Sequence, residues 1–234
     1  MPRRYYLFVV VALAAITVFV QLGRWQLDRL RERRAANEAL VSRRSLPEQT
    51  LANLASDTST SRFRALRVVG TYDYAHQFIW TARTREGAPG IVFLTPMVID
   101  SAHAVLVNRG WAYSPDGMQI DEPLWNEAER DTVIGYAESY TAGTGRVFLG
   151  STPRRIRRLS LDSLRSALPY DIAPLIIVQQ RGAGLQTEVK HPFRAALPPL
   201  DEGPHRGYAL QWFAFALITI VGTAAAVQRG RREA

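Results

Sequence analysis

The sequence predicts a membrane protein of the α+β class, in which two terminal transmembrane helices flank a β-rich soluble domain. Three observations predict this fold class. The apolar residues of the 234-residue chain gather at its two ends. Between the ends, short alternating stretches of polar and apolar residues are separated by turn signals. Many of the arginines flank the two apolar runs, where they would meet lipid headgroups.

Both apolar runs are long enough to cross a bilayer. Residues 5–22 hold 18 positions without a charge, and residues 208–227 hold 20. About 20 apolar residues span roughly 30 Å of hydrocarbon. Two spans place both termini on the same side of the membrane. The arginines that close the chain favour the cytoplasm for that side, although the arginines at 24–34 pull the other way.

The first helix is expected to continue beyond the membrane, because residues 24–40 mix apolar and charged side chains without a helix breaker. Pro47 ends this segment. The expected parts are a first transmembrane helix (1–23), a juxtamembrane helical extension (24–46), a β-rich extracytoplasmic domain (47–204), a second transmembrane helix (205–228) and a basic cytoplasmic tail (229–234).

The central domain is expected to be an antiparallel, α+β or small-barrel fold. The alternation of polar and apolar residues predicts its strands, which are 66–74, 78–84, 91–99, 104–109, 132–139 and 175–180. Short helices are expected at 121–130 and 160–168, the second with a serine or aspartate as its cap.

The composition excludes several classes of function. The chain has no cysteine, so disulfide scaffolds, thiolate metal sites and thiol nucleophiles are excluded. It also lacks a nucleophile elbow, a phosphate loop, a dinucleotide fingerprint and a zinc-protease helix. The carboxylates at 121, 122, 127 and 129 are expected to face solvent. We therefore expect no enzyme, and an unrecognised hydrolase is disfavoured. The net charge of +8 fits either nucleic acid or anionic lipid as the partner, and the arginines that flank the apolar runs favour lipid.

Four short patterns occur in register with this topology. They are Gly23-Arg24-Trp25-Gln26-Leu27-Asp28-Arg29, Gly70-Thr71-Tyr72-Asp73, the stretch from Gly90 to Gly110-Trp111, and His205 with Tyr208-Ala209-Leu210-Gln211-Trp212. In this order they resemble the Surfeit-locus family of cytochrome c oxidase biogenesis factors. The resemblance implies a role in assembly of the oxidase catalytic subunit and, in bacterial members, the holding of haem a. Pro204 and Arg206 depart from the family pattern around the histidine.

The start of the second span is the expected haem site. His205, Tyr208 and Trp212 follow i, i+3, i+7, so they share one face of a helix. His205 would be the axial ligand of the haem iron, because the helix dipole disfavours a charged imidazole there. Tyr208 and Trp212 would cover the macrocycle. Gln211, Arg24 and Trp25 complete the expected cofactor-binding set.

Other residues near this site allow alternatives. The aromatic residues also fit an interfacial belt, and Gln21 and Gln211 would lie at one membrane level. Haem propionates would find arginines to pair with, and the candidates are Arg24, Arg206 and Arg109. Arg109 also fits a brace of a hairpin.

The remaining histidines are expected at the surface, and they are His76, His103 and His191. A basic cluster fits anionic lipid, an acidic subunit or a solvated strand edge, and it comprises Arg154, Arg155, Arg157 and Arg158.

The expected function is that of a non-enzymatic membrane chaperone that holds haem a transiently and presents it to the oxidase catalytic subunit. The alternative is a purely protein-binding scaffold for oxidase assembly without a cofactor. The N-terminus leaves no room for a transit peptide, so the expected location is the bacterial inner (plasma) membrane, with two crossings and an extracytoplasmic main domain.

Overall fold

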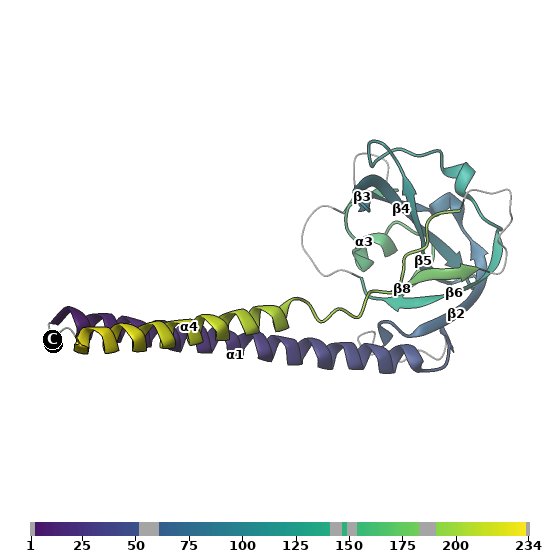
Figure 1. Ribbon diagram of the computed structural model, residues 1–234. Helices are drawn as coiled ribbons and strands as arrows, with labels where there is room; N and C mark the ends of the chain where they lie inside the picture. The colour runs from purple at the N-terminus through teal and green to yellow at the C-terminus, as the bar shows by residue number, and fades with distance from the viewer. Residues whose placement is uncertain (1–2, 52–60, 141–146, 149–153, 183–190, 233–234) are drawn as a thin grey trace. The chain divides into compact units, whose positions relative to one another are not determined.

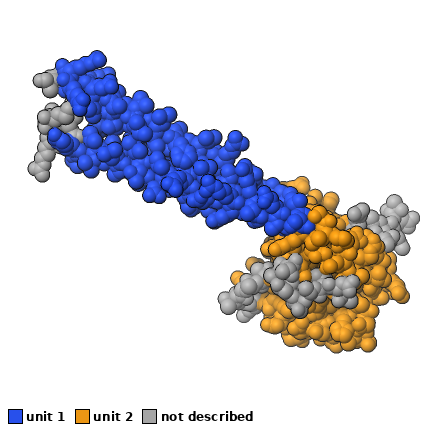
Figure 2. All heavy atoms as spheres, turned by 90° about the horizontal axis from the view of Figure 1, so that it is seen from below, with its two compact units in different colours: residues 1–42, 198–234 blue, residues 43–197 orange. Residues whose placement is uncertain are grey.

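The computed structural model describes residues 3–51, 61–140, 147–148, 154–182 and 191–232. The chain divides into two compact units (Figure 2). One unit comprises residues 1–42 and 198–234, and contains most of the first helix and all of the last. The other comprises residues 43–197 and contains the strands. Each unit is described by itself below.

The helical unit is a pair of long antiparallel helices (Figure 1). Helix α1 (Arg3–Ser45) is continuous through the apolar run and the charged stretch behind it, so the predicted extension is confirmed. It ends two residues before Pro47, because the residue before a proline disfavours helical dihedral angles. Helix α4 (His205–Arg232) begins at His205 and continues through the terminal arginines.

The strand unit is built around a five-stranded barrel, and we call it the barrel unit (Figure 1). The barrel strands, in spatial order, are β2 (Ala65–Tyr72), β6 (Arg130–Glu138), β8 (Asp171–Gly182), β5 (His103–Tyr113) and β4 (Ala88–Val98). Pairing of Tyr72 with Met97 closes the ring. The β5–β8 pair is parallel, and the other barrel pairs are antiparallel.

The remaining elements of this unit lie outside the five-stranded ring. They are β1 (Gln49–Thr50), the 3₁₀ turn η2 (Tyr74–His76), β3 (Phe78–Arg85), the 3₁₀ turn η3 (Glu122–Trp125), β7 (Arg155–Ile156) and α3 (Leu161–Arg165). Strand β3 pairs with β4, and β7 pairs with β3.

Strand β5 of the barrel is buried on both faces. Val105 and Val107 of β5 belong to the inner core, whereas Ala104 and Leu106 face a second core that includes Ile156 and residues around α3. Successive side chains of a strand point to opposite faces. The two-sided burial explains why β5 contains an uninterrupted apolar run.

The predicted strands all have counterparts in the structure, but one predicted helix is wrong. The chain makes only the short turn η3 at Glu122–Trp125, leaves it in an extended conformation at Asn126 and reaches β6 without a helix. The ring of Trp125 packs on Phe93 of the barrel. Pro123 lies in the first turn of η3, where proline is tolerated. The element ends at Trp125, the residue whose ring packs on Phe93. The helix expected at 160–168 is confirmed but shorter, at Leu161–Arg165.

Candidate functional site

The facing sides of α1 and α4 form a regular contact line, which we call the helix seam. The less exposed positions recur at alternating steps of four and three, as in two helices that pack at a small angle. The seam consists of Ala12, Ile16, Phe19, Gly23, Gln26 and Leu30 on α1, and of His205, Ala209, Trp212, Ala216 and Thr219 on α4.

Aromatic rings fill the middle of the helix seam. Phe19 stacks on Trp212 at 5.8 Å between ring centroids, and Phe215 contacts both rings. The ring of Phe213 lies against Gly23, where a Cβ would come within 2.7 Å of it. Gly23 therefore leaves room between the helices for the ring of Phe213.

A polar contact closes the seam where α4 begins. His205 Nδ1 lies 2.8 Å from Oε1 of Gln26. Gln26 is buried, with 9% of its surface exposed, and His205 is half-buried. About two turns further along α1, Arg34 forms a two-pronged ion pair with Glu202, at 2.8 and 2.9 Å. These contacts fix the segment before α4 to the side of α1.

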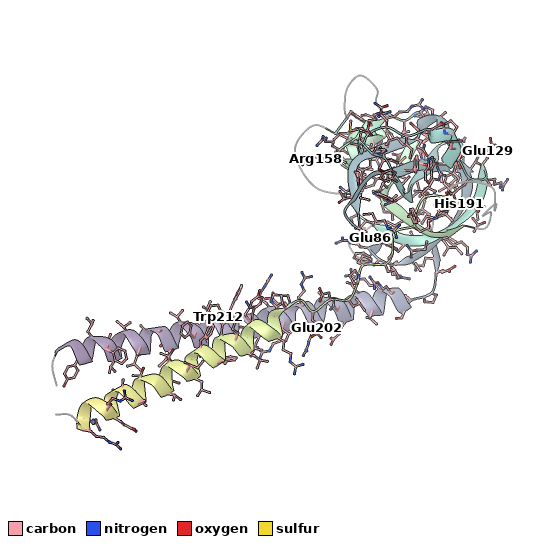
Figure 3. The ribbon with its side chains drawn as sticks, turned by 45° about the horizontal axis from the view of Figure 1, so that its top comes forward. Glu86, Glu129, Arg158, His191, Glu202 and Trp212 are labelled. Atoms are coloured by element: carbon pink, nitrogen blue, oxygen red, sulfur yellow. The ribbon has the colours of Figure 1, made fainter. Side chains whose placement is uncertain are left out.

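The structure separates the predicted haem-site residues into two groups. His205 and Trp212 lie in the helix seam, and Figure 3 labels Trp212 on α4. Tyr208 does not share their face, because Ala209 occupies the seam position between them and leaves Tyr208 48% exposed.

On α1, Arg24 and Trp25 are both exposed, Trp25 by 54%. Gln21 and Gln211 are exposed as well. The side chain that reaches α4 is instead Gln26, which the sequence reasoning missed. The spacing of three residues from Gly23 was the signal that could have found it.

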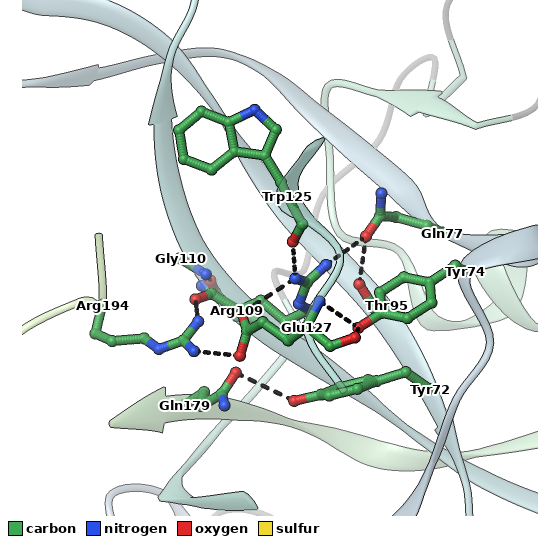
Figure 4. A network of polar contacts seen from close by, with 11 residues as sticks. Tyr72, Tyr74, Gln77, Thr95, Arg109, Gly110, Trp125, Glu127, Gln179 and Arg194 are labelled. Carbon is green, nitrogen blue, oxygen red and sulfur yellow. Dashed lines mark hydrogen bonds and ion pairs between the residues drawn. The ribbon is translucent and has the colours of Figure 1, made fainter. Parts of the chain in front are cut away.

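Arg109 forms the centre of a buried polar network inside the barrel unit (Figure 4). It is fully buried and forms an ion pair with Glu127 at 3.0 Å. Its guanidinium also donates to Gln77 Oε1 at 3.0 Å and to the carbonyl of Trp125. Arg194 donates to the second oxygen of Glu127 at 2.5 Å. Arg109 is therefore a brace within the domain, and it is not available for a propionate.

Backbone irregularity explains how Arg109 reaches the interior. Asn108 pairs with Leu94, but Gly110 pairs with the adjacent Phe93, so Arg109 is the extra residue of a β-bulge. Bulges bend a strand and change the direction of a side chain. The rings of Tyr72 and Tyr74 and of Phe93 then lie within 5.0 to 5.6 Å of the guanidinium carbon. The aromatic faces provide a favourable environment for the buried cation.

The expectation that Glu127 faces solvent is wrong, whereas its neighbour Glu129 is exposed. Burial acts to raise the pKa of Glu127, but the hydrogen bond from Arg194 and the charge of Arg109 outweigh it, so this pKa lies below its ordinary value. Two residues apart, Glu127 and Glu129 would share a face of a regular strand, but the chain bends at Glu129, and only Glu127 is directed into the buried network.

The lowered pKa of Glu127 predicts how stability depends on acid. A carboxyl with a lower pKa in the folded chain contributes stability above its unfolded pKa, and this contribution is lost as pH falls through the folded pKa. We expect the free energy of unfolding to decline below about pH 4.3, and to decline less steeply in Glu127→Gln. Denaturant unfolding followed by circular dichroism across this range would measure both slopes. Equal slopes for wild type and Glu127→Gln would show that Glu127 does not cause the loss of stability in acid.

His76 and His103 each have a partner three residues away. His76 Nδ1 lies 2.7 Å from Asp73, and His103 Nδ1 lies 2.9 Å from Asp100. The side chain of His103 is 68% exposed, that of His76 is 40% exposed, and His191 is half-buried. Within the described ranges, no group of three or more histidine or carboxylate side chains is placed to hold a metal ion.

The basic cluster at 154–158 surrounds the edge strand β7. Arg155 donates to the carbonyl of Met118, and Arg154, Arg157 and Arg158 are exposed. Its contact with lipid or with an acidic subunit stays a prediction.

Comparison with known proteins identifies similar chains. A family model described as the SURF1 family matches residues 13–217. Two SURF1-like proteins, one from Mycobacterium bovis and one from Mycobacterium tuberculosis, are each 23% identical to this chain over 258 aligned positions. The alignment covers 95% of this chain and 86% of each relative. The matched range includes the barrel and the contact between Gln26 and His205.

Proposed function

Because the chain belongs to the SURF1 family, whose members are in general oxidase assembly factors, we propose that it holds haem a transiently for the catalytic subunit of a haem-copper oxidase. The observation that carries the proposal is the placement of His205. It stands at the first residue of α4, half-buried and held by Gln26.

The residues at the start of α4 fit a haem. Haem iron takes an imidazole nitrogen as axial ligand, and His205 places an imidazole at the start of α4. Gly203 lies beside the Nε2 edge of the ring, where a Cβ would stand 3.4 Å from Nε2. The missing side chain leaves space at the ligating nitrogen. Tyr208 and Trp25 are exposed aromatic residues near this level, and Arg24 and Arg206 are exposed arginines for propionates.

In this proposal Trp212 and Gln211 act differently from one another. Trp212 is packed on Phe19 and Phe215 in the helix seam and holds α4 against α1. Gln211 is exposed on α4 and available for hydrogen bonds to a ligand or to lipid headgroups. The chain carries out no chemistry on the haem, and serves as a chaperone.

Two features support a membrane location. Both α1 and α4 contain apolar windows long enough to cross a bilayer, with mean hydropathies of 2.3 and 1.9. Their outward side chains are exposed, among them Leu13 at 58%, Leu217 at 61% and Ile218 at 66%. Such a surface is suited to lipid. We infer that both helices cross the bacterial inner membrane, that the barrel unit is extracytoplasmic and that the terminal arginines are cytoplasmic.

The proposal predicts a spectroscopic result. Wild-type protein purified in detergent from cells that make haem a should show a Soret band, and His205→Ala should lose it because the iron has lost its nitrogen ligand. His103→Ala is the matched control, since His103 is an exposed histidine elsewhere in the chain. Circular dichroism should show that both variants are folded.

Two results would contradict the haem-holding function. One is a wild-type protein without haem a, which would leave the protein-binding scaffold. The other is a Soret band of wild-type height in His205→Ala.

A further inference from the structure

The ring of His205 is held at one edge by a side chain of α1 and faces a glycine at the other edge. Gln26 on α1 contacts Nδ1, and Gly203 lies along the opposite edge of the ring. We propose that Gln26 is a positioning residue that selects the tautomer of His205 in which Nδ1 carries the proton and Nε2 is the free ligand nitrogen. This inference rests on the proposed haem-holding function and adds the residue that prepares the ligand.

The chemistry of the contact determines the tautomer. The atom of Gln26 that faces His205 is the carbonyl oxygen Oε1, 2.8 Å from Nδ1. An amide oxygen only accepts hydrogen bonds, so Nδ1 must donate. A neutral imidazole has one ring proton. With that proton on Nδ1, Nε2 keeps its lone pair and can bind iron.

The surroundings of Gln26 make this selection effective. Its residue surface is only 9% exposed, so water has little access to compete for the amide oxygen. Gly23 and Leu30 precede and follow it in the helix seam, and both are buried. A partner that holds the second ring nitrogen of a ligating histidine fixes both the ring orientation and the protonation state.

Gly203 keeps the Nε2 edge open. Its φ of +70° is a conformation that favours glycine, and its N–H donates to Asp201 Oδ1 at 2.7 Å, which fixes the turn. A Cβ at this position would lie 3.3 Å from Cδ2 and 3.4 Å from Nε2 of His205. The same glycine therefore serves the turn before α4 and the space beside the ligand nitrogen.

The test is the tautomer of His205 in protein without haem. The full chain is labelled with ¹⁵N in its four histidines and placed in lipid bilayers at about pH 8.5, well above the usual imidazole pKa of about 6.5. Nitrogen NMR distinguishes a protonated from an unprotonated ring nitrogen, and His205→Ala identifies the signals. Wild type should show a protonated Nδ1 and an unprotonated Nε2.

Variants of Gln26 separate positioning from packing. Gln26→Leu keeps a side chain of similar size without the acceptor, and should give a substantial population with the proton on Nε2. Gln26→Glu keeps an acceptor oxygen and should retain the wild-type tautomer. Gln21→Leu, at an exposed glutamine of the same helix, should change nothing. A wild-type ring protonated on Nε2, or an unchanged tautomer in Gln26→Leu, would overturn the proposal.

Haem retention provides the second measurement. Loss of such a supporting partner lowers affinity for a metal about 10- to 100-fold, so Gln26→Leu should release haem a at correspondingly higher dilution. Gly203→Ala should also retain less haem but leave the tautomer unchanged. Gly207→Ala, where no atom lies within 4 Å of the added Cβ, is its control and should behave as wild type.

The two measurements distinguish the two proposals. If wild type shows the expected tautomer but never carries haem, the haem-holding function is wrong and the positioning by Gln26 stands. If wild type carries haem through His205 and Gln26→Leu retains it equally, the positioning role is wrong. Full haem retention in Gly203→Ala would overturn the role given to the open Nε2 edge.

Discussion

Glu127→Gln is expected to lower the free energy of unfolding of the barrel unit by about 3 to 5 kcal/mol, the usual cost of removing one partner from a buried ion pair. The side chain of Glu127 is 2% exposed and binds two arginines, Arg109 and Arg194. Glutamine would leave two buried or half-buried cations without an anion. Its amide would also present a donor to one of two guanidinium groups, which have no acceptor to offer.

Glu129→Gln is the matched control for this substitution. It removes the same charge two residues away, at an exposed position, and should change stability by less than about 0.5 kcal/mol. Denaturant unfolding of the two variants and wild type, followed by near-ultraviolet circular dichroism, would measure the difference. Similar stabilities for both variants would show that the Arg109 network contributes little to the fold.

Gly110→Ala is expected to destabilise the barrel unit by about 3 kcal/mol, through backbone strain and displaced hydrogen bonds. Gly110 has a φ of +126°, and a Cβ there would lie 2.4 Å from the carbonyl oxygen of Phe193. That oxygen accepts from Trp111 N at 2.9 Å, and Phe193 N donates to Trp111 O at 2.7 Å. An added methyl group must push the backbone at Phe193 away from Trp111, which would break these two hydrogen bonds.

Gly87→Ala separates the two contributions. Gly87 also has a positive φ, of +81°, but no atom lies within 4 Å of an added Cβ. It should therefore show only the conformational cost, about 1 kcal/mol. Thermal unfolding of wild type, Gly87→Ala and Gly110→Ala would rank their stabilities. Equal losses in both variants would mean that the contact with Phe193 has no energetic importance.

Much of the fold follows from local patterns. The uncharged run at 5–22 and the unbroken helical stretch after it predict α1, and the apolar run from 208 predicts α4. Strand-like stretches between turn signals predict the barrel strands, including β5, whose ends the structure extends to His103 and Tyr113. Closure of the barrel and the parallel β5–β8 pair do not follow from these patterns, because a strand pattern shows which faces are buried but does not show which strand lies beside it.

The sequence by itself determined the two long helices, the strands of the soluble domain and the family resemblance, because these depend on periodicity and on short motifs. Only the tertiary structure decided which polar residues meet. Glu127 lies 18 residues from Arg109 and 67 from Arg194, and Gln26 lies 179 from His205. A charged or amide side chain has the same local pattern in solvent as in a core. Its burial depends on partners that only folding brings together.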